Sequence, residues 1–109
     1  MADSTLPAAQ ALDLRSLITP TEQGIASRIL AKRTGGNVTL FAFDAGQGLS
    51  EHTAPYDALV QVLDGRATIT VGGAAHDVVA GEMLLLPANV PHALHAPQRF
   101  KMVLTMIRA

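Results

Sequence analysis

Gly46-Gln-Gly-Leu-Ser-Glu-His52-Thr-Ala-Pro and Gly81-Glu-Met-Leu-Leu-Leu-Pro87-Ala-Asn-Val-Pro-His92 are the two stretches that decide the fold of this chain. In each of them a histidine follows a glycine, and short aliphatic runs lie on both sides. The histidines stand at positions 52 and 92, so only a chain that folds back on itself can bring them together.

The chain around these stretches has the pattern of an antiparallel β-structure. From Ile25 onward, short runs of β-favouring residues alternate with turn residues, which is typical of a barrel or sandwich. No helix-length periodic segment follows residue 25, so an architecture of parallel strands joined by helices is excluded. The expected strands are Ala26–Lys32, Asn37–Phe43, Ala58–Leu63, Arg66–Val71, Ala74–Val79, Met83–Leu86, Ala93–Ala96 and Phe100–Ile107.

Glycine pairs and a proline mark the connections between these runs. Asp64-Gly65 is a favoured pair for a two-residue type I′ hairpin turn, and Gly72-Gly73 supplies the same backbone freedom. Gly35-Gly36 and Ala96-Pro97-Gln98 interrupt the chain in the same way. These signals predict three hairpins in series.

Length and composition predict a single domain with an arm. A chain of 109 residues makes one ordinary core. Residues 1–24 form an Ala-rich N-terminal arm, in which Ala8–Leu17 is weakly compatible with a helix, and residues 25–109 form the barrel domain. Hydrophobic residues reach 49% and charged residues only 16%, so we expect apolar surface to meet a second copy in a homodimer.

Several classes of function are excluded by composition and motif content. The net charge is −1 and no basic stripe is present, so nucleic acid is not an expected partner. There is no cysteine, no Gly-x-Ser-x-Gly elbow, no phosphate-binding loop and no His-Glu-x-x-His pair. Neither a secretory leader nor a membrane-length apolar run is present, so we expect a cytoplasmic protein without membrane contact.

The two opening stretches resemble the two motifs of the cupin superfamily, over roughly residues 38–107. This resemblance implies an all-β fold, the double-stranded β-helix or jelly-roll barrel, here preceded by the N-terminal arm. The local sequence is similar to that of small bacterial single-domain cupins, whose activities are mostly unassigned. The positions that fit the motif spacings are Gly46, His52, Gly65, Gly81, Pro87 and His92.

The departures from the motifs lie at positions that carry the family's chemistry. Ala54 stands where the second histidine of the first motif would be, and Ala58 where its glutamate would be. Asn89 replaces a glycine of the second motif. The family metal is typically held by three histidines and one glutamate, so the resemblance implies only His52 and His92 as ligands here.

A metal at this site needs a third protein ligand, because catalytic zinc and non-haem iron take about three. Asp57 is the best candidate, since it is one residue from the family's carboxylate position and a bulge after Pro55 could turn it inward. Glu51 and His95 are disfavoured, because strand neighbours point to opposite faces. The expected cofactor is one divalent transition metal (Fe, Mn, Ni, Cu or Zn) or none.

The alanines also predict a roomier and more apolar barrel. Period-two alternation places Ala54, Ala58, Val60 and Leu94 on its wall beside His92, with Tyr56 near its mouth. We interpret Met83, Met102 and Met106 as core filler rather than sulfur ligands. His76 and His95 are expected at the surface.

Three functional hypotheses remain, and the sequence leaves open whether the protein is an enzyme. The first is a cupin that binds a small molecule in its barrel, with a metal site reduced to two histidines. The second is a metal-dependent oxygenase or isomerase of a small organic molecule that uses His52, His92 and a third ligand. The third is a dimeric structural or partner-binding module with a filled barrel.

Overall fold

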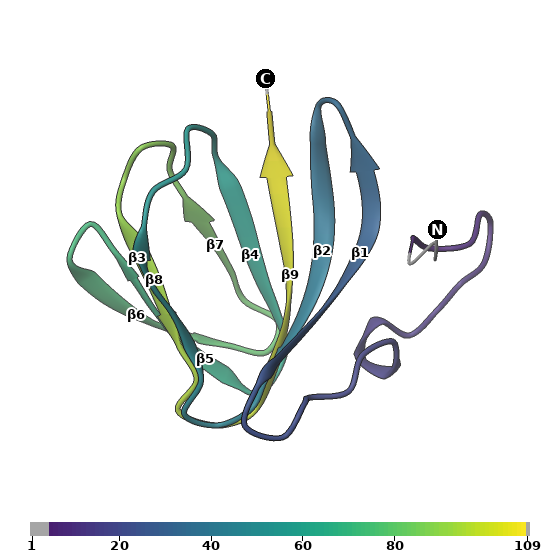
Figure 1. Cartoon of the computed structure of the whole chain (residues 1–109), viewed down its shortest axis with the longest axis horizontal. Helices are drawn as coiled ribbons and strands as arrows, with labels where there is room; N and C mark the ends of the chain where they lie inside the picture. The colour runs from purple at the N-terminus through teal and green to yellow at the C-terminus, as the bar shows by residue number, and fades with distance from the viewer. Residues whose placement is uncertain (1–4, 109) are drawn as a thin grey trace.

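The computed structural model describes residues 5–108, and in this part of the chain two antiparallel β-sheets form a barrel (Figure 1). One sheet has the strand order β1-β2-β9-β4-β7 and the other β3-β8-β5-β6. The two sheets converge at one end and diverge at the other, where β9 ends (Figure 1). The strands are β1 (Ile25–Arg33), β2 (Gly36–Phe43), β3 (Gly48–His52), β4 (Ala58–Asp64), β5 (Arg66–Val71), β6 (Ala74–Val79), β7 (Met83–Leu86), β8 (His92–His95) and β9 (Phe100–Ile107).

The predicted all-β fold and all eight predicted strands are confirmed, and β3 is an additional strand. The segment Gly48–His52 is polar and rich in exposed positions, with no β-branched residue to mark it as a strand. It forms the edge of the four-stranded sheet through its pairing with β8. Tertiary pairing therefore makes a strand where local propensity is weak.

The prediction of three hairpins in series is wrong. β4 and β5 belong to different sheets, so Asp64-Gly65 carries the chain across the barrel instead of closing a hairpin. Gly65 has a φ of +78°, and a Cβ there would lie 2.2 Å from the Arg99 carbonyl oxygen. The glycine is required for this close approach. The Ala96-Pro97-Gln98 turn likewise crosses between sheets, from β8 to β9.

Two hairpins are present at the other predicted turns. Gly72-Gly73 joins β5 to β6, with Val71 paired to Ala74, and both glycines have positive φ. Gly35-Gly36 lies at the turn between β1 and β2. The positive φ of both Gly72 and Gly73 is what a type I′ turn requires at its two central residues.

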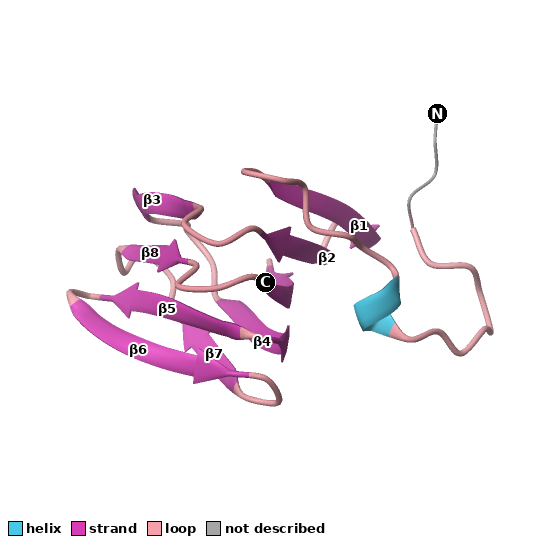
Figure 2. Ribbon diagram, turned by 90° about the horizontal axis from the view of Figure 1, so that it is seen from below, coloured by secondary structure: helices cyan, strands magenta, loops and turns pink. Residues whose placement is uncertain are grey.

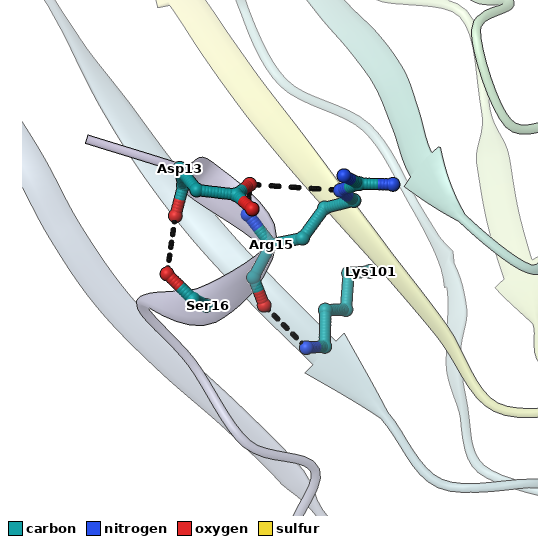
Figure 3. A network of polar contacts seen from close by, with 4 residues as sticks. All are labelled: Asp13, Arg15, Ser16 and Lys101. Carbon is teal, nitrogen blue, oxygen red and sulfur yellow. Dashed lines mark hydrogen bonds and ion pairs between the residues drawn. The ribbon is translucent and has the colours of Figure 1, made fainter. Parts of the chain in front are cut away.

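The arm forms a single helical turn instead of a helix over Ala8–Leu17. This turn is the 3₁₀ helix η1 (Leu14–Ser16), whose N-cap Asp13 accepts a hydrogen bond from the Arg15 backbone N–H at 3.1 Å. The Lys101 Nζ on β9 donates to the Arg15 carbonyl (Figure 3). Residues 1–4 of the predicted arm, and Ala109 at the end of the predicted barrel domain, lie outside the described residues.

The buried side chains form two groups. The larger one lies between the sheets, and at the converging end Phe43 and Phe100 stack with ring centroids 4.5 Å apart. The smaller one lies between the arm and the outer face of the five-stranded sheet, and it includes Ile18, Leu40 and Val103. Figure 2 shows the arm running beside β1 and β2. No helix in residues 5–108 has the length and apolar character needed to cross a membrane.

An ion pair links two chain segments at the converging end of the barrel. The Arg99 Nε lies 2.7 Å from the Asp44 Oδ1, and the Gln23 backbone N–H donates to the Asp44 Oδ2 at 2.6 Å. The Gln23 N–H and the Arg99 guanidinium hold the pKa of Asp44 below its ordinary value. With this end closed, the space left between the sheets lies toward the diverging end.

Candidate functional site

A cavity of about 150 Å³ lies between the two sheets toward the diverging end of the barrel. Several of the residues around it come from strand positions near that end: His52 ends β3, Ala58 begins β4, His92 begins β8 and Met106 is one residue from the end of β9. The wall consists almost wholly of aliphatic and thioether side chains. Its lining residues are Leu49, His52, Ala54, Ala58, Val60, Leu86, His92, Leu94, Met102, Leu104 and Met106.

The polar side chains in this wall are the two histidines. His52 and His92 are direct partners in the β3–β8 ladder, and their ring centroids are 4.4 Å apart with an interplanar angle of 72°. Their Nε2 atoms approach to 3.1 Å. His92 is buried, with 6% of its surface exposed, whereas His52 is exposed. One ring of the pair is therefore buried at the cavity, and the other is exposed to solvent.

The second nitrogen of each ring contacts a backbone carbonyl. The His52 Nδ1 lies 2.8 Å from the Ser50 oxygen, and the His92 Nδ1 lies 3.2 Å from the Val90 oxygen. A carbonyl can only accept a hydrogen bond, so each Nδ1 carries the hydrogen and donates it. In the neutral rings both Nε2 atoms then hold a lone pair, and these two lone pairs face one another.

The environment of His92 favours its neutral form. Burial lowers the pKa of His92, and the charge of His52 lowers it further, while the Val90 carbonyl acts in the opposite direction. When both rings are neutral, the pair offers two converging acceptors without a hydrogen between them. A hydrogen-bond donor or a cation placed there would be stabilised.

The predicted wall residues Ala54, Ala58, Val60 and Leu94 all line the cavity together with the two histidines. Because alanine stands at both positions where the family carries a ligand, the cavity is apolar at those places. Tyr56 is not among the lining residues. Its ring instead lies under the Arg108 guanidinium, 5.1 Å from the ring centroid, in the loop before β4.

Asp57 is not placed beside the histidines. Its Oδ1 accepts a hydrogen bond from the Ala88 backbone N–H at 2.8 Å, and its side chain is exposed. The backbone carbonyl of Asp57 accepts from the Ile107 N–H at 3.0 Å, which fixes the residue at the start of β4. No three His, Cys, Asp or Glu side chains in residues 5–108 gather closely enough to hold a metal ion. The predicted three-ligand set of His52, His92 and Asp57 is therefore not assembled.

The loop that leads to His92 depends on Asn89. This residue has a φ of +64°, in the left-handed region that asparagine tolerates better than most residues other than glycine. Its backbone N–H donates to the Ala54 carbonyl at 2.8 Å. Asparagine thus holds a left-handed backbone at a position where the resemblance implies a glycine.

Five wall residues were not predicted: Leu49, Leu86, Met102, Leu104 and Met106. Three of them follow period-two alternation along β9, so the pattern that identified the Ala58 face contained the same signal. Glu51, His76 and His95 are exposed.

Two antiparallel sheets enclosing a cavity, with histidines supplied by the ends of β3 and β8, define a small jelly-roll barrel with an internal binding site. The chain belongs to the cupin family: the model of the Cupin domain matches residues 39–108. A curated relative, an uncharacterized protein from Streptomyces coelicolor, is 39% identical over 59 residues. That match covers 54% of this chain and 56% of the relative's length.

Solved structures agree with this assignment. The crystal structure of a conserved protein of unknown function from Streptococcus pyogenes has a TM-score of 0.91 and 33% identity, covering 96% of this chain and 92% of that one. A cupin superfamily protein from Desulfitobacterium hafniense has a TM-score of 0.90 and 33% identity, with 96% of each chain covered. The arm and the barrel thus both have counterparts in similar bacterial proteins.

Proposed function

We propose that this protein binds a compact small molecule in the barrel cavity, with an apolar body against the aliphatic wall and one hydrogen-bond donor at the histidine pair. The volume of about 150 Å³ suits a molecule the size of a single ring. An apolar protein cavity of about 150 Å³ is known to accept benzene. Pockets that bind small molecules combine such a wall with a few convergent polar groups.

The observation that carries this proposal is the Nε2–Nε2 approach of 3.1 Å between His52 and His92. Both Nδ1 hydrogens are already donated to backbone carbonyls, so neither ring supplies a hydrogen to the other. A hydroxyl or ammonium group of a ligand supplies the missing donor. The rest of the ligand gains by leaving water for the apolar wall.

The residues do not fit the divalent metal that the family typically holds. Two imidazoles converge on the cavity, and Asp57 is engaged with the Ala88 N–H. Catalytic zinc and non-haem iron take about three protein nitrogen or oxygen ligands. The metal-dependent enzyme is therefore supported less well than the binding protein. The filled-barrel module is also less well supported, since the barrel encloses a cavity.

The proposal is tested by titrating the protein with phenol and with benzene while NMR follows the methyl signals of Val60, Leu94 and Met106. We expect saturable shifts with both probes and a several-fold tighter affinity for phenol, because only phenol carries a donor. The preference for phenol should disappear in His92→Ala. Equal affinity for the two probes in the wild type would contradict the role of the histidines.

A matched pair of variants locates the binding. Ala58→Leu fills the cavity from its wall and should abolish the saturable shifts, whereas Ala75→Leu places the same side chain at an exposed position of β6 and should leave them unchanged. Circular dichroism checks that both variants fold. Unchanged phenol binding in a folded Ala58→Leu variant would refute binding inside the barrel.

A further inference from the structure

A ligand group with a single hydrogen satisfies only half of the histidine pair. The Nε2 atoms of His52 and His92 lie 3.1 Å apart, and both Nδ1 hydrogens are donated to backbone carbonyls. When both rings are neutral, the site therefore presents two neighbouring acceptors and no donor. A polar atom left without a partner in a buried site costs free energy. The complete ligand therefore brings two hydrogens, one for each nitrogen.

We propose that the ligands of this cavity are aromatic vicinal diols, single rings with hydroxyls on two neighbouring carbons, of which one donates to His52 and the other to His92. This inference rests on the proposed function and extends it from one donor to two. Neighbouring ring carbons hold their hydroxyl oxygens about 2.8 Å apart, the length of an ordinary O–H···O hydrogen bond. That spacing is close to the 3.1 Å between the two Nε2 atoms, so each hydroxyl faces its own nitrogen.

A single nitrogen with two hydrogens fits the pair less well. A donor atom about 2.9 Å from each Nε2 sees the two nitrogens at an angle of roughly 65°, much narrower than the angle between two N–H bonds on one atom. Both hydrogen bonds would then be bent. An aliphatic amine also carries a positive charge at neutral pH, and the cavity wall contains no carboxylate to pair with it. Two hydroxyls, whose hydrogens rotate independently, meet neither difficulty.

The cavity wall favours an aromatic ring over other vicinal diols. Apart from the two histidines, the lining residues are aliphatic or thioether side chains. A sugar or glycerol would place its further hydroxyls against this wall without hydrogen-bonding partners among its side chains. A ring whose remaining edge carries only C–H groups gains free energy from burial instead. The cavity of about 150 Å³ suits one such ring.

The two histidines differ in burial, and this difference separates the two contacts experimentally. His92 has 6% of its surface exposed, whereas His52 is exposed to solvent. The hydroxyl that donates to His92 is therefore bound in the interior, and the one that donates to His52 lies closer to solvent. His52→Ala removes the second acceptor and leaves the buried one in place.

The experiment titrates chelator-treated protein with catechol, resorcinol, phenol and aniline in the absence of oxygen, while NMR follows the methyl signals of Val60 and Leu94. Catechol and resorcinol contain the same atoms and differ in the separation of their hydroxyls, so their comparison isolates the spacing. We expect catechol to bind at least tenfold more tightly than each of the other three probes. Equal affinity for catechol and resorcinol, or for catechol and aniline, would overturn the assignment.

Two histidine variants complete the test. His52→Ala should remove the advantage of catechol over resorcinol, whereas phenol should still bind more tightly than benzene because His92 remains. His76→Ala removes an exposed histidine of β6 that is not among the lining residues, and it should leave every affinity unchanged. Circular dichroism checks that both variants fold. A catechol advantage that persists in folded His52→Ala would also overturn the assignment.

The same titrations distinguish failure of this inference from failure of the proposed function. If the wild type prefers phenol to benzene but binds catechol and resorcinol equally, the diol assignment alone is wrong. If the wild type does not distinguish phenol from benzene, the role of the histidine pair in both proposals is wrong.

Discussion

Single residues with unusual backbone shape position the histidine pair. Asn89 adopts a φ of +64° three residues before His92, and its N–H ties the loop to the Ala54 carbonyl. The histidines themselves are held from behind, each by the carbonyl two residues earlier in the chain. The acceptor pair is therefore preorganised by the backbone, and the ligand does not have to order it.

Asn89→Ala should destabilise the fold by about 1 kcal/mol, because a left-handed conformation costs an ordinary L-residue about 1–2 kcal/mol. Asn89→Gly should leave the stability nearly unchanged, since glycine adopts this conformation freely. Urea denaturation of both variants measures the difference. A stable alanine variant would show that the loop does not depend on the left-handed backbone.

Many of the residues that line the candidate site could be predicted from the sequence. Motif spacing identified His52 and His92, and alternation identified Ala54, Ala58, Val60 and Leu94 as wall residues. It did not place Asp57, whose orientation depends on a contact with Ala88, thirty-one residues away. It interpreted Met106 as core filler, and this side chain packs against the larger buried group and also lines the cavity.

The strands and turns show where local signals are insufficient. The eight predicted strands are present because β-branched and aliphatic runs suit a half-buried sheet. The Asp64-Gly65 and Gly72-Gly73 turns look alike in sequence, yet one crosses between sheets and the other closes a hairpin. Both require positive φ, and only long-range packing distinguishes them.

Gly65→Ala and Gly73→Ala therefore form a matched pair at the scale of elements. Both glycines have positive φ, but a Cβ at Gly65 would lie 2.2 Å from the Arg99 oxygen, whereas at Gly73 nothing lies within 4 Å. We expect a loss of about 1–2 kcal/mol for Gly73→Ala from backbone strain alone. Gly65→Ala should lose at least about 3 kcal/mol, because overpacking adds to the strain. Equal losses in thermal or urea unfolding would contradict the proposed close approach.

On the scale of the whole molecule, one outer edge is left apolar. Met83 is 57% exposed and Leu85 is 48% exposed, and being two residues apart they face the same side of β7. β7 is an edge strand that pairs with β4. Edge strands with exposed apolar side chains are normally covered, and a two-fold axis lets one such edge cover another. The homodimer predicted from composition stays a prediction, and this edge is its proposed interface.

Sedimentation velocity tests the dimer. We expect the wild type to sediment as a dimer and Leu85→Glu to sediment as a monomer, because a charge on the strand opposes burial against a second copy. Gln98→Glu adds the same charge at an exposed position in the loop before β9 and should leave the dimer intact. A monomeric wild type, or a dimeric Leu85→Glu variant, would contradict this assignment.

The most direct test of the central claim is a crystal structure of the protein with phenol. The account predicts the ring inside the cavity, against Ala58, Val60 and Leu94, with its oxygen within hydrogen-bond distance of the Nε2 atoms of His52 and His92. Two results would contradict the claim that the barrel binds a ligand through the histidine pair. One is a cavity without phenol at saturating concentration, and the other is a bound ring whose oxygen is directed away from both histidines.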